Sequence, residues 1–185
     1  MRNGASGITK LWEQITPDEA VHSIYDINLD KLRDNGIRLL LTDLDNTLVS
    51  WRNSDVPPEL LEWSVRVQNL GFVLCLLSNG GQDRVQRFAA QVDLPYLARA
   101  GKPRAKAYQK TMERFAVSAK QTAMIGDQLF TDVRGARRLG VYAILVHPLY
   151  PREWWGTRVV RLVEKAAFYF LKRRAAKRKN LRKGE

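Results

Sequence analysis

An apolar run that ends in two closely spaced acids constrains this chain more than any other feature. Residues 39–48 read LLLTDLDNTL, so three leucines and a threonine precede Asp43 and Asp45, and Thr47 follows them. Such a run is typical of a strand buried in a parallel sheet, and these sheets carry their chemistry at the carboxyl ends of the strands. Because burying charge is costly unless a cation or hydrogen bonds compensate for it, the two acids indicate a metal site there.

Strands and helices alternate along most of the chain, which predicts one α/β domain. Apolar runs predict five strands, at residues 37–42, 72–77, 96–98, 122–125 and 141–146. Amphipathic stretches between them predict helices over residues 57–70, 82–92, 104–115 and 131–139. Two more helices are expected before the first strand, one over residues 28–35 and one that begins at Thr16 and Pro17, with Glu19 completing a capping box. This order predicts a parallel sheet covered by helices on both faces.

Polar residues recur where later strands are expected to end. Ser78 and Asn79 follow the second strand together with two glycines, and a hydroxyl with glycine-rich backbone N–H groups at a helix entrance suits a phosphate. Lys102 precedes a helix, and Asp127 and Asp132 follow the fourth strand. Each set alone would fit an ordinary turn or a solvated surface residue. The four sets together, two acids followed by a hydroxyl, a cation and two more acids, indicate Mg²⁺-dependent phosphate chemistry.

These four sets resemble, in order and spacing, the four motifs of the haloacid dehalogenase (HAD) superfamily over about residues 37–146. The resemblance implies a Rossmann-like, three-layer α/β/α fold with a parallel five-stranded sheet, in which the first and fourth strands are adjacent. One helix and one strand fill the chain between the first two motifs, and the next gap is also short, so there is no room for a cap domain. The chain therefore resembles the capless subfamily IIIA phosphatases, whose open site can receive a phosphate on something large.

The resemblance implies catalytic roles for Asp43, Asp45 and Lys102. Phosphoryl transfer through a covalent intermediate needs one group to attack phosphorus and another to protonate the leaving oxygen. Asp43 corresponds to the nucleophile and Asp45 to the general acid and base. An acid at position 45 argues against dehalogenase chemistry, which has no leaving alkoxide to protonate.

The same resemblance implies a phosphate site and a metal site. The substrate phosphate would be bound by Ser78, Asn79 and Thr47. The Mg²⁺ ligands would be Asp43, the carbonyl of Asp45, and Asp127. Asp132 would orient either the ligands of the metal ion or Lys102.

The C-terminal segment carries most of the net charge. Residues 152–185 hold twelve Lys/Arg and three acids, a charge of +9, whereas the rest of the chain contributes only +3 of the formal +12. Its apolar residues recur at helical spacing after Trp154 and Trp155, which is typical of an interfacial membrane helix, although such a stripe could equally pack on the domain. We therefore expect an N-terminal helical segment packing on the core (1–36), a HAD-like phosphatase domain (37–150) and a basic amphipathic tail (151–185).

Within the superfamily, the chain resembles the group that contains the phosphatidylglycerophosphate phosphatases. Residues 42–48 and 126–133 carry this resemblance, together with residues 17–19 and 23–27. It implies dephosphorylation of phosphatidylglycerophosphate to phosphatidylglycerol at an anionic membrane surface. Two alternatives stay open: a phosphatase for a protein or nucleic-acid phosphate, with the tail holding RNA, and a non-catalytic phosphate-binding scaffold. The oligomeric state is open.

Cysteine content and hydropathy bear on location. The lone Cys75 excludes a disulfide framework and a thiolate zinc site, and it lies in an apolar run that predicts a core position. The first residues are not followed by a signal-type apolar segment, and no uncharged apolar run approaches the roughly 20 residues of a spanning helix. We expect a cytoplasmic protein, peripheral to a membrane.

Overall fold

The protein is described by a computed structural model, which covers residues 11–51 and 55–149. The expectations for the basic tail lie outside these described residues. Among the helices that are described, none combines the length and apolar character needed to cross a bilayer.

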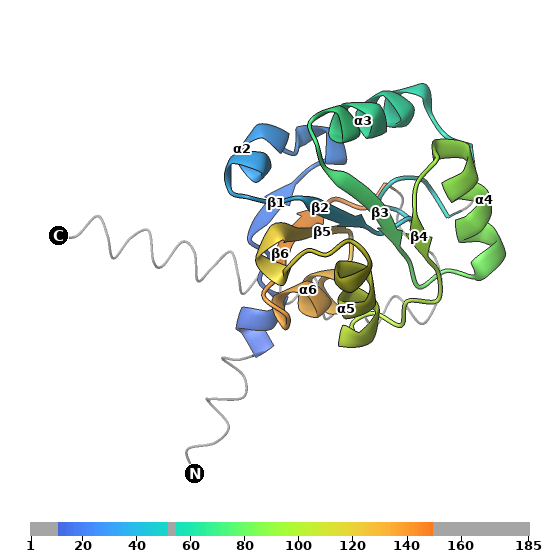
Figure 1. Ribbon diagram of the computed structural model, residues 1–185. Helices are drawn as coiled ribbons and strands as arrows, with labels where there is room; N and C mark the ends of the chain where they lie inside the picture. Colours follow the sequence, from blue (N-terminus) through green and yellow to red (C-terminus); the bar gives the residue numbers. More distant parts are fainter. Residues whose placement is uncertain (1–10, 52–54, 150–185) are drawn as a thin grey trace, which may run out of the picture. The chain divides into compact units, whose positions relative to one another are not determined.

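A parallel sheet with the strand order β1-β6-β5-β2-β3-β4 forms the centre of the fold (Figure 1). The strands are β1 Glu19–Val21, β2 Leu39–Thr42, β3 Val73–Leu77, β4 Tyr96–Leu97, β5 Thr122–Gly126 and β6 Tyr142–Val146. Every residue of β2 and β5 is buried, as their apolar sequences predict. These two strands pair in register from Leu39 opposite Thr122 to Thr42 opposite Ile125, which confirms that the first and fourth predicted strands are neighbours.

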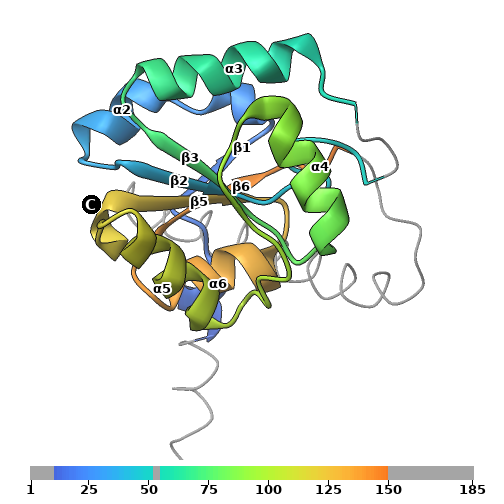
Figure 2. The ribbon, with the colours of Figure 1, turned by 45° about the vertical axis from the view of Figure 1, so that its right-hand side comes forward.

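Helices cover both faces of the sheet, so the architecture is the expected three-layer α/β/α (Figure 2). The helices are α2 Leu29–Asp34, α3 Pro58–Asn69, α4 Gln82–Val92, α5 Ala105–Arg114 and α6 Arg134–Arg137. Shorter turns are η1 Ile24–Asp26, η2 Ala119–Gln121 and the π-helical η3 Leu129–Val133. On one face, α2, α3 and α4 contribute apolar side chains such as Leu32, Trp63 and Phe88 to the main core cluster. On the other face lie α5 and α6.

The described connections on either side of β3 each contain a single helix. One helix, α3, separates β2 from β3, and one helix, α4, separates β3 from β4. The described part of the chain therefore contains no cap domain, as expected.

The sheet has six strands, whereas the sequence predicted five. The extra strand is β1, where the capping-box pattern predicted a helix beginning at Thr16 and Pro17 with Glu19. Residues 11–15 are helical instead, and the Thr16 hydroxyl donates to the carbonyl of Trp12 at 2.6 Å, where that helix ends. The segment 1–36 is therefore not wholly helical.

Contacts with β6 explain why this segment is extended. The backbone N–H of Asp18 donates to the carbonyl of Ala143 at 2.9 Å, and the Asp18 carboxylate accepts from the backbone N–H of Ala143 at 2.8 Å. Arg137 pairs with the same carboxylate. The Tyr142 hydroxyl donates to Glu19 at 3.2 Å. A capping box satisfies only its own turn, whereas pairing with β6 satisfies the backbone along the sheet.

Candidate active site

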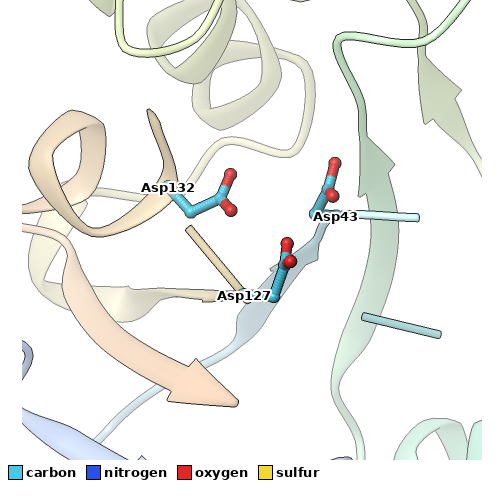
Figure 3. Close-up of side chains that lie close together, drawn as sticks. All are labelled: Asp43, Asp127 and Asp132. Atoms are coloured by element: carbon cyan, nitrogen blue, oxygen red, sulfur yellow. The ribbon is translucent and has the colours of Figure 1, made fainter. Parts of the chain in front are cut away.

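Three carboxylates meet at the carboxyl edge of the sheet (Figure 3). Asp43 directly follows β2, Asp127 follows the neighbouring β5, and Asp132 projects from the π-helical turn η3. Each offers an oxygen atom that lies within 4.8 Å of the others. Asp43 and Asp132 are buried and Asp127 is partly buried, so the cluster concentrates negative charge in a poorly solvated place. Such a cluster is stable only where cations compensate for it.

Lys102 supplies one of these cations. Its Nζ atom lies 2.7 Å from Oδ1 of Asp43 and 2.7 Å from Oδ1 of Asp132, and its side chain is 1% exposed. Burial by itself lowers the pKa of Lys102, but Asp132 and Asp43 outweigh burial, and the net pKa is raised above its ordinary value. Lys102 is therefore a fixed positive charge between the two acids.

Asn79 holds the backbone of Lys102 in place. The Asn79 side-chain oxygen accepts from the Lys102 N–H at 2.8 Å, and its Nδ2 donates to the Lys102 carbonyl at 3.2 Å. The Lys102–Pro103 peptide bond is cis. The sequence predicted that Asn79 binds substrate. In the structure its side-chain amide contacts the Lys102 backbone, and a contact between Asn79 and substrate stays a prediction.

Ser78 and Gly80 lie close to Asp45. The buried Ser78 hydroxyl accepts from the backbone N–H of Gly80 at 3.1 Å and retains its own hydrogen to donate. A Cβ atom added at Gly80 would lie 3.2 Å from Ser78 Oγ and 3.5 Å from Asp45 Oδ2. Gly80 thus allows the predicted phosphate-binding hydroxyl and the predicted general acid to lie close to the same stretch of backbone.

Asp45 is paired with Arg84, a residue that the sequence analysis missed. Arg84 lies in the first turn of α4, where its Nε and Nη2 atoms lie 2.9 and 2.7 Å from Asp45 Oδ1. Nη2 also donates to the Ser50 carbonyl at 3.0 Å. One signal was available in the sequence: a cation in the first turn of a helix opposes the helix dipole. A cation at this unfavourable position indicates that its side chain makes a compensating contact outside the helix.

Asn46 and Thr47 complete the turn that leaves β2. Asn46 adopts a φ of 66°, and its backbone N–H donates to the Val49 carbonyl at 2.7 Å. Within the described part of the chain, neither the Asn46 amide nor the Thr47 hydroxyl has a hydrogen-bond partner, although both side chains are buried. Buried polar groups normally have a hydrogen-bond partner. The lack of a protein partner for the Thr47 hydroxyl among the described residues is therefore compatible with the predicted contact between Thr47 and substrate.

The π-helical turn and two glycines place Asp132. The Gln128 carbonyl accepts from the N–H groups of both Asp132 and Val133, and the Gln128 N–H donates to Asp132 Oδ2 at 3.1 Å. A Cβ atom at Gly126 would lie 2.4 Å from the Asp132 carboxylate, and one at Gly135 would lie 2.5 Å from the Tyr108 hydroxyl. That hydroxyl donates to the Asp132 carbonyl at 3.2 Å. The helix predicted over residues 131–139 therefore begins earlier, as a π turn that brings Asp132 back toward the sheet.

Burial raises the pKa of Asp132 to about 6, because desolvation and the nearby Asp43 outweigh the opposing effect of Lys102. The carboxylate thus depends on Lys102 for its charge. Asp132 contacts Lys102 directly, in line with the orienting role expected from the sequence.

The two histidines lie at the same edge of the sheet as the acids. His22 follows β1 and His147 follows β6, and their ring centroids are 5.4 Å apart. Both side chains are exposed. Their contact with each other gives neither residue a catalytic role. Cys75 is buried in β3, as predicted.

The residues present fit a divalent cation of the Mg²⁺ type. Mg²⁺ prefers oxygen ligands and is held by one or two carboxylates together with substrate phosphate and water. Asp43 and Asp127 offer such carboxylates from adjacent strands, and Lys102 contacts one oxygen atom each of Asp43 and Asp132. A site with two carboxylates, a buried lysine and a serine hydroxyl can hold a metal ion and a phosphate together.

Comparisons with known proteins agree with this arrangement. A family model for HAD-hydrolase-like proteins matches residues 99–148. The chain is 35% identical over 158 residues to the "Probable phosphatase YqeG" of Bacillus subtilis (strain 168), covering 85% of this chain and 92% of that protein. An uncharacterized protein from Listeria monocytogenes serotype 4b has a similar fold, with a TM-score of 0.51 at 17% identity over 64% of this chain and 85% of that chain.

A second relative is the "Phosphatidylglycerophosphate phosphatase 1, chloroplastic/mitochondrial" of Arabidopsis thaliana. It is 23% identical over 180 residues, which cover 92% of this chain and 51% of the plant protein. The chain thus spans about half of that relative's length.

The fold and these relatives define an enzyme of the phosphatase class. The chain belongs to the HAD superfamily, as its sequence motifs predicted, with the Bacillus phosphatase as a relative along most of its length.

Proposed function

We propose that this phosphatase is Mg²⁺-dependent and transfers the phosphoryl group to Asp43. The observation that carries the proposal is the position of Lys102 Nζ, 2.7 Å from both Asp43 and Asp132, beside Asp127. A carboxylate can approach an anionic phosphate only where positive charge neutralises both. Mg²⁺ held by Asp43, Asp127 and the Asp45 carbonyl would supply further positive charge and polarise the phosphoryl oxygens.

The first chemical step forms an aspartyl-phosphate. An Asp43 oxygen attacks phosphorus, and the bond between phosphorus and the ester oxygen breaks as the new P–O bond forms. Asp45 gives its proton to the departing alkoxide. Ser78 donates its hydroxyl hydrogen to a phosphoryl oxygen, and Thr47 lies in the same turn as the two acids.

The second step regenerates the enzyme. Asp45, now ionised, takes a proton from water, and the oxygen of that water attacks phosphorus. The bond to Asp43 breaks, which releases inorganic phosphate and leaves Asp45 protonated for the next cycle. Asn79 and Asp132 contribute by holding Lys102 in place throughout.

Replacing Asp43 with Asn tests the nucleophile. The amide is a poor nucleophile of nearly the same size, so we expect kcat on p-nitrophenyl phosphate to fall by at least about 10³-fold. Asp34→Asn is a matched control, because Asp34 is exposed at the end of α2. Hydrolysis at the wild-type rate by Asp43→Asn would refute the proposed nucleophile.

We propose phosphatidylglycerophosphate as the substrate, with release of phosphatidylglycerol at a membrane surface. The name of the Arabidopsis relative supports this substrate. The absence of a cap among the described residues supports a bulky phosphomonoester. The charge of +9 on residues 152–185 supports an anionic lipid surface, where each basic residue contributes about 1 kcal/mol.

A substrate comparison tests the lipid assignment. The full chain would be assayed with Mg²⁺ on phosphatidylglycerophosphate in mixed micelles and on soluble phosphomonoesters. We expect the highest kcat/KM on the lipid and loss of activity on chelation of the metal. A strong preference for soluble phosphates would reject the lipid. Binding of RNA that weakens with salt, without binding to anionic liposomes, would favour a nucleic-acid phosphate instead.

A further inference from the structure

Among the described residues, Arg84 is a charged residue beside the reacting groups, and the proposed mechanism gives it no task. Its guanidinium lies 2.7 Å from Oδ1 of Asp45, and its side chain is 25% exposed, whereas that of Lys102 is 1% exposed. Lys102 is thus enclosed with Asp43 and Asp132, whereas Arg84 is partly exposed beside Asp45. The two cations serve different parts of the site.

The position of Asp45 identifies the part that Arg84 serves. In the proposed mechanism Asp45 protonates the oxygen of the leaving alcohol, so Asp45 lies on the side where the rest of the substrate extends. Arg84 contacts Asp45 from α4, and Asp45 also lies close to Gly80, beside Ser78. In the proposed mechanism, the guanidinium would therefore lie near the part of the leaving alcohol that is attached to the departing oxygen.

A second contact places Arg84 at the rim of the site. Nη2 donates to the carbonyl of Ser50, the residue before Trp51, whose side chain is 42% exposed. Arg84 thereby joins Asp45 to the backbone at Ser50. A group attached to the leaving alcohol would pass this guanidinium on its way out.

We propose that Arg84 binds a second anionic group on the leaving alcohol, a phosphodiester separated from the reacting phosphate by one glycerol. Arginine suits this role because its planar guanidinium presents five N–H donors and can contact a carboxylate and a phosphate together. The proposal rests on the proposed lipid function, because phosphatidylglycerophosphate carries a phosphodiester at that position. It makes Arg84 a residue that selects substrates by the anion beyond the scissile bond.

The simpler role for Arg84 is to position Asp45 alone. These two roles differ in what they do to substrate choice. Loss of positioning lowers kcat/KM on every alkyl phosphate, because each needs a proton on its leaving oxygen. Loss of a phosphodiester contact lowers kcat/KM further, and only for substrates that carry the second anion.

The experiment compares two soluble substrates that share a leaving group of the same chemical type. One is sn-glycerol 3-phosphate, and the other is the deacylated headgroup of phosphatidylglycerophosphate, which adds the phosphodiester. The readout is the ratio of their kcat/KM values with the full-length protein and Mg²⁺. We expect the wild type to prefer the headgroup, and Arg84→Gln to reduce that preference by about 10- to 100-fold, as befits a charge-assisted contact.

Two further variants sharpen the result. Arg84→Lys keeps the positive charge but loses the planar set of guanidinium N–H donors. This variant should therefore retain part of the preference for the headgroup over sn-glycerol 3-phosphate. Arg87→Gln removes the same charge from the exposed face of the same helix and should leave the preference unchanged. Circular dichroism of each variant confirms that it is folded.

An equal fall on both substrates in Arg84→Gln, with an unchanged ratio, would overturn the proposal and leave Arg84 as a positioning residue. A wild-type protein that does not prefer the headgroup would overturn it as well. The intact lipid separates the two hypotheses. If the wild type hydrolyses phosphatidylglycerophosphate but Arg84→Gln leaves the ratio of the two kcat/KM values unchanged, only the role of Arg84 is refuted. If the wild type does not hydrolyse the lipid, the proposed function is refuted.

Discussion

Lys102 Nζ lies 2.7 Å from Asp43 Oδ1, although 59 positions of sequence separate the two residues and both side chains are almost fully buried. The pair depends on two features of the fold. The strand β2 carries Asp43 to the edge of the sheet, and the Asn79 amide holds the Lys102 backbone beside it. A third group, Asp132, shares the same ammonium.

Replacing Lys102 with Met should damage both stability and activity. Removal of one partner of a buried ion pair leaves carboxylates without compensation, which costs about 3–5 kcal/mol of unfolding free energy. The loss of positive charge beside the phosphate should lower kcat by about 10²- to 10³-fold. Urea unfolding and p-nitrophenyl phosphate hydrolysis would measure the two effects. Lys110→Met, on the exposed side of α5, is the matched control and should change neither quantity appreciably.

Gly126→Ala should displace Asp132. The new methyl group would lie 2.4 Å from the Asp132 carboxylate, closer than atoms can approach, so the acid or the strand must shift. Overpacking of this kind costs about 1–3 kcal/mol, and we expect phosphatase activity to fall with it because Lys102 loses a partner. Gly81→Ala, whose Cβ would meet open space, controls for the stability effect. Unchanged stability and activity in Gly126→Ala would contradict the close approach of Asp132 to β5.

Asp127→Asn should weaken the effect of Mg²⁺ on stability. A ligand that binds only the folded state raises the unfolding midpoint in proportion to the logarithm of its concentration, and a metal ion between Asp43 and Asp127 would also relieve their repulsion. We expect a rise of the wild-type melting temperature with Mg²⁺ and a much smaller rise in the variant. Differential scanning calorimetry with and without chelator would show the difference. An identical rise in both proteins would exclude Asp127 as a ligand.

Cys75 should resist thiol reagents in the folded protein. Burial raises the pKa of this thiol from 9.0 to about 12, so the thiolate is scarce at neutral and moderately alkaline pH. A raised folded-state pKa means that the folded protein holds the proton more tightly than the unfolded chain. The contribution of Cys75 to stability is therefore fully present below about pH 9 and declines as the pH rises toward 12.

Labelling with a chromogenic disulfide reagent at about pH 8 checks this expectation. Cys75 is the only cysteine in the chain, so the signal has one source. The native protein should react slowly, and the urea-unfolded protein should react at once. Rapid labelling of the native protein would show that β3 is accessible to solvent.

Much of the fold followed from patterns that extend over a few residues. The apolar run before Asp43 predicted a buried strand, and the polar residues after three other strands marked the edge that carries the site. Asn28 and Pro57 predicted where α2 and α3 begin, because caps and prolines act through the nearest backbone groups. These local rules failed at Thr16 and Glu19, where a plausible capping box gave way to pairing of β1 with β6.

By itself, the sequence determined that Asp43, Ser78 and Asp127 follow strands, that Lys102 precedes a helix, and which class of chemistry these residues serve. Only the tertiary structure decided that Asp45 pairs with Arg84, 39 positions away, and that the Asn79 amide hydrogen-bonds to the Lys102 backbone. It also decided that the Asp132 side chain packs against Gly126. The physical reason is the range of the forces involved. Hydrophobic periodicity and capping act between near neighbours, whereas these contacts exist only once the buried sheet has brought distant segments together.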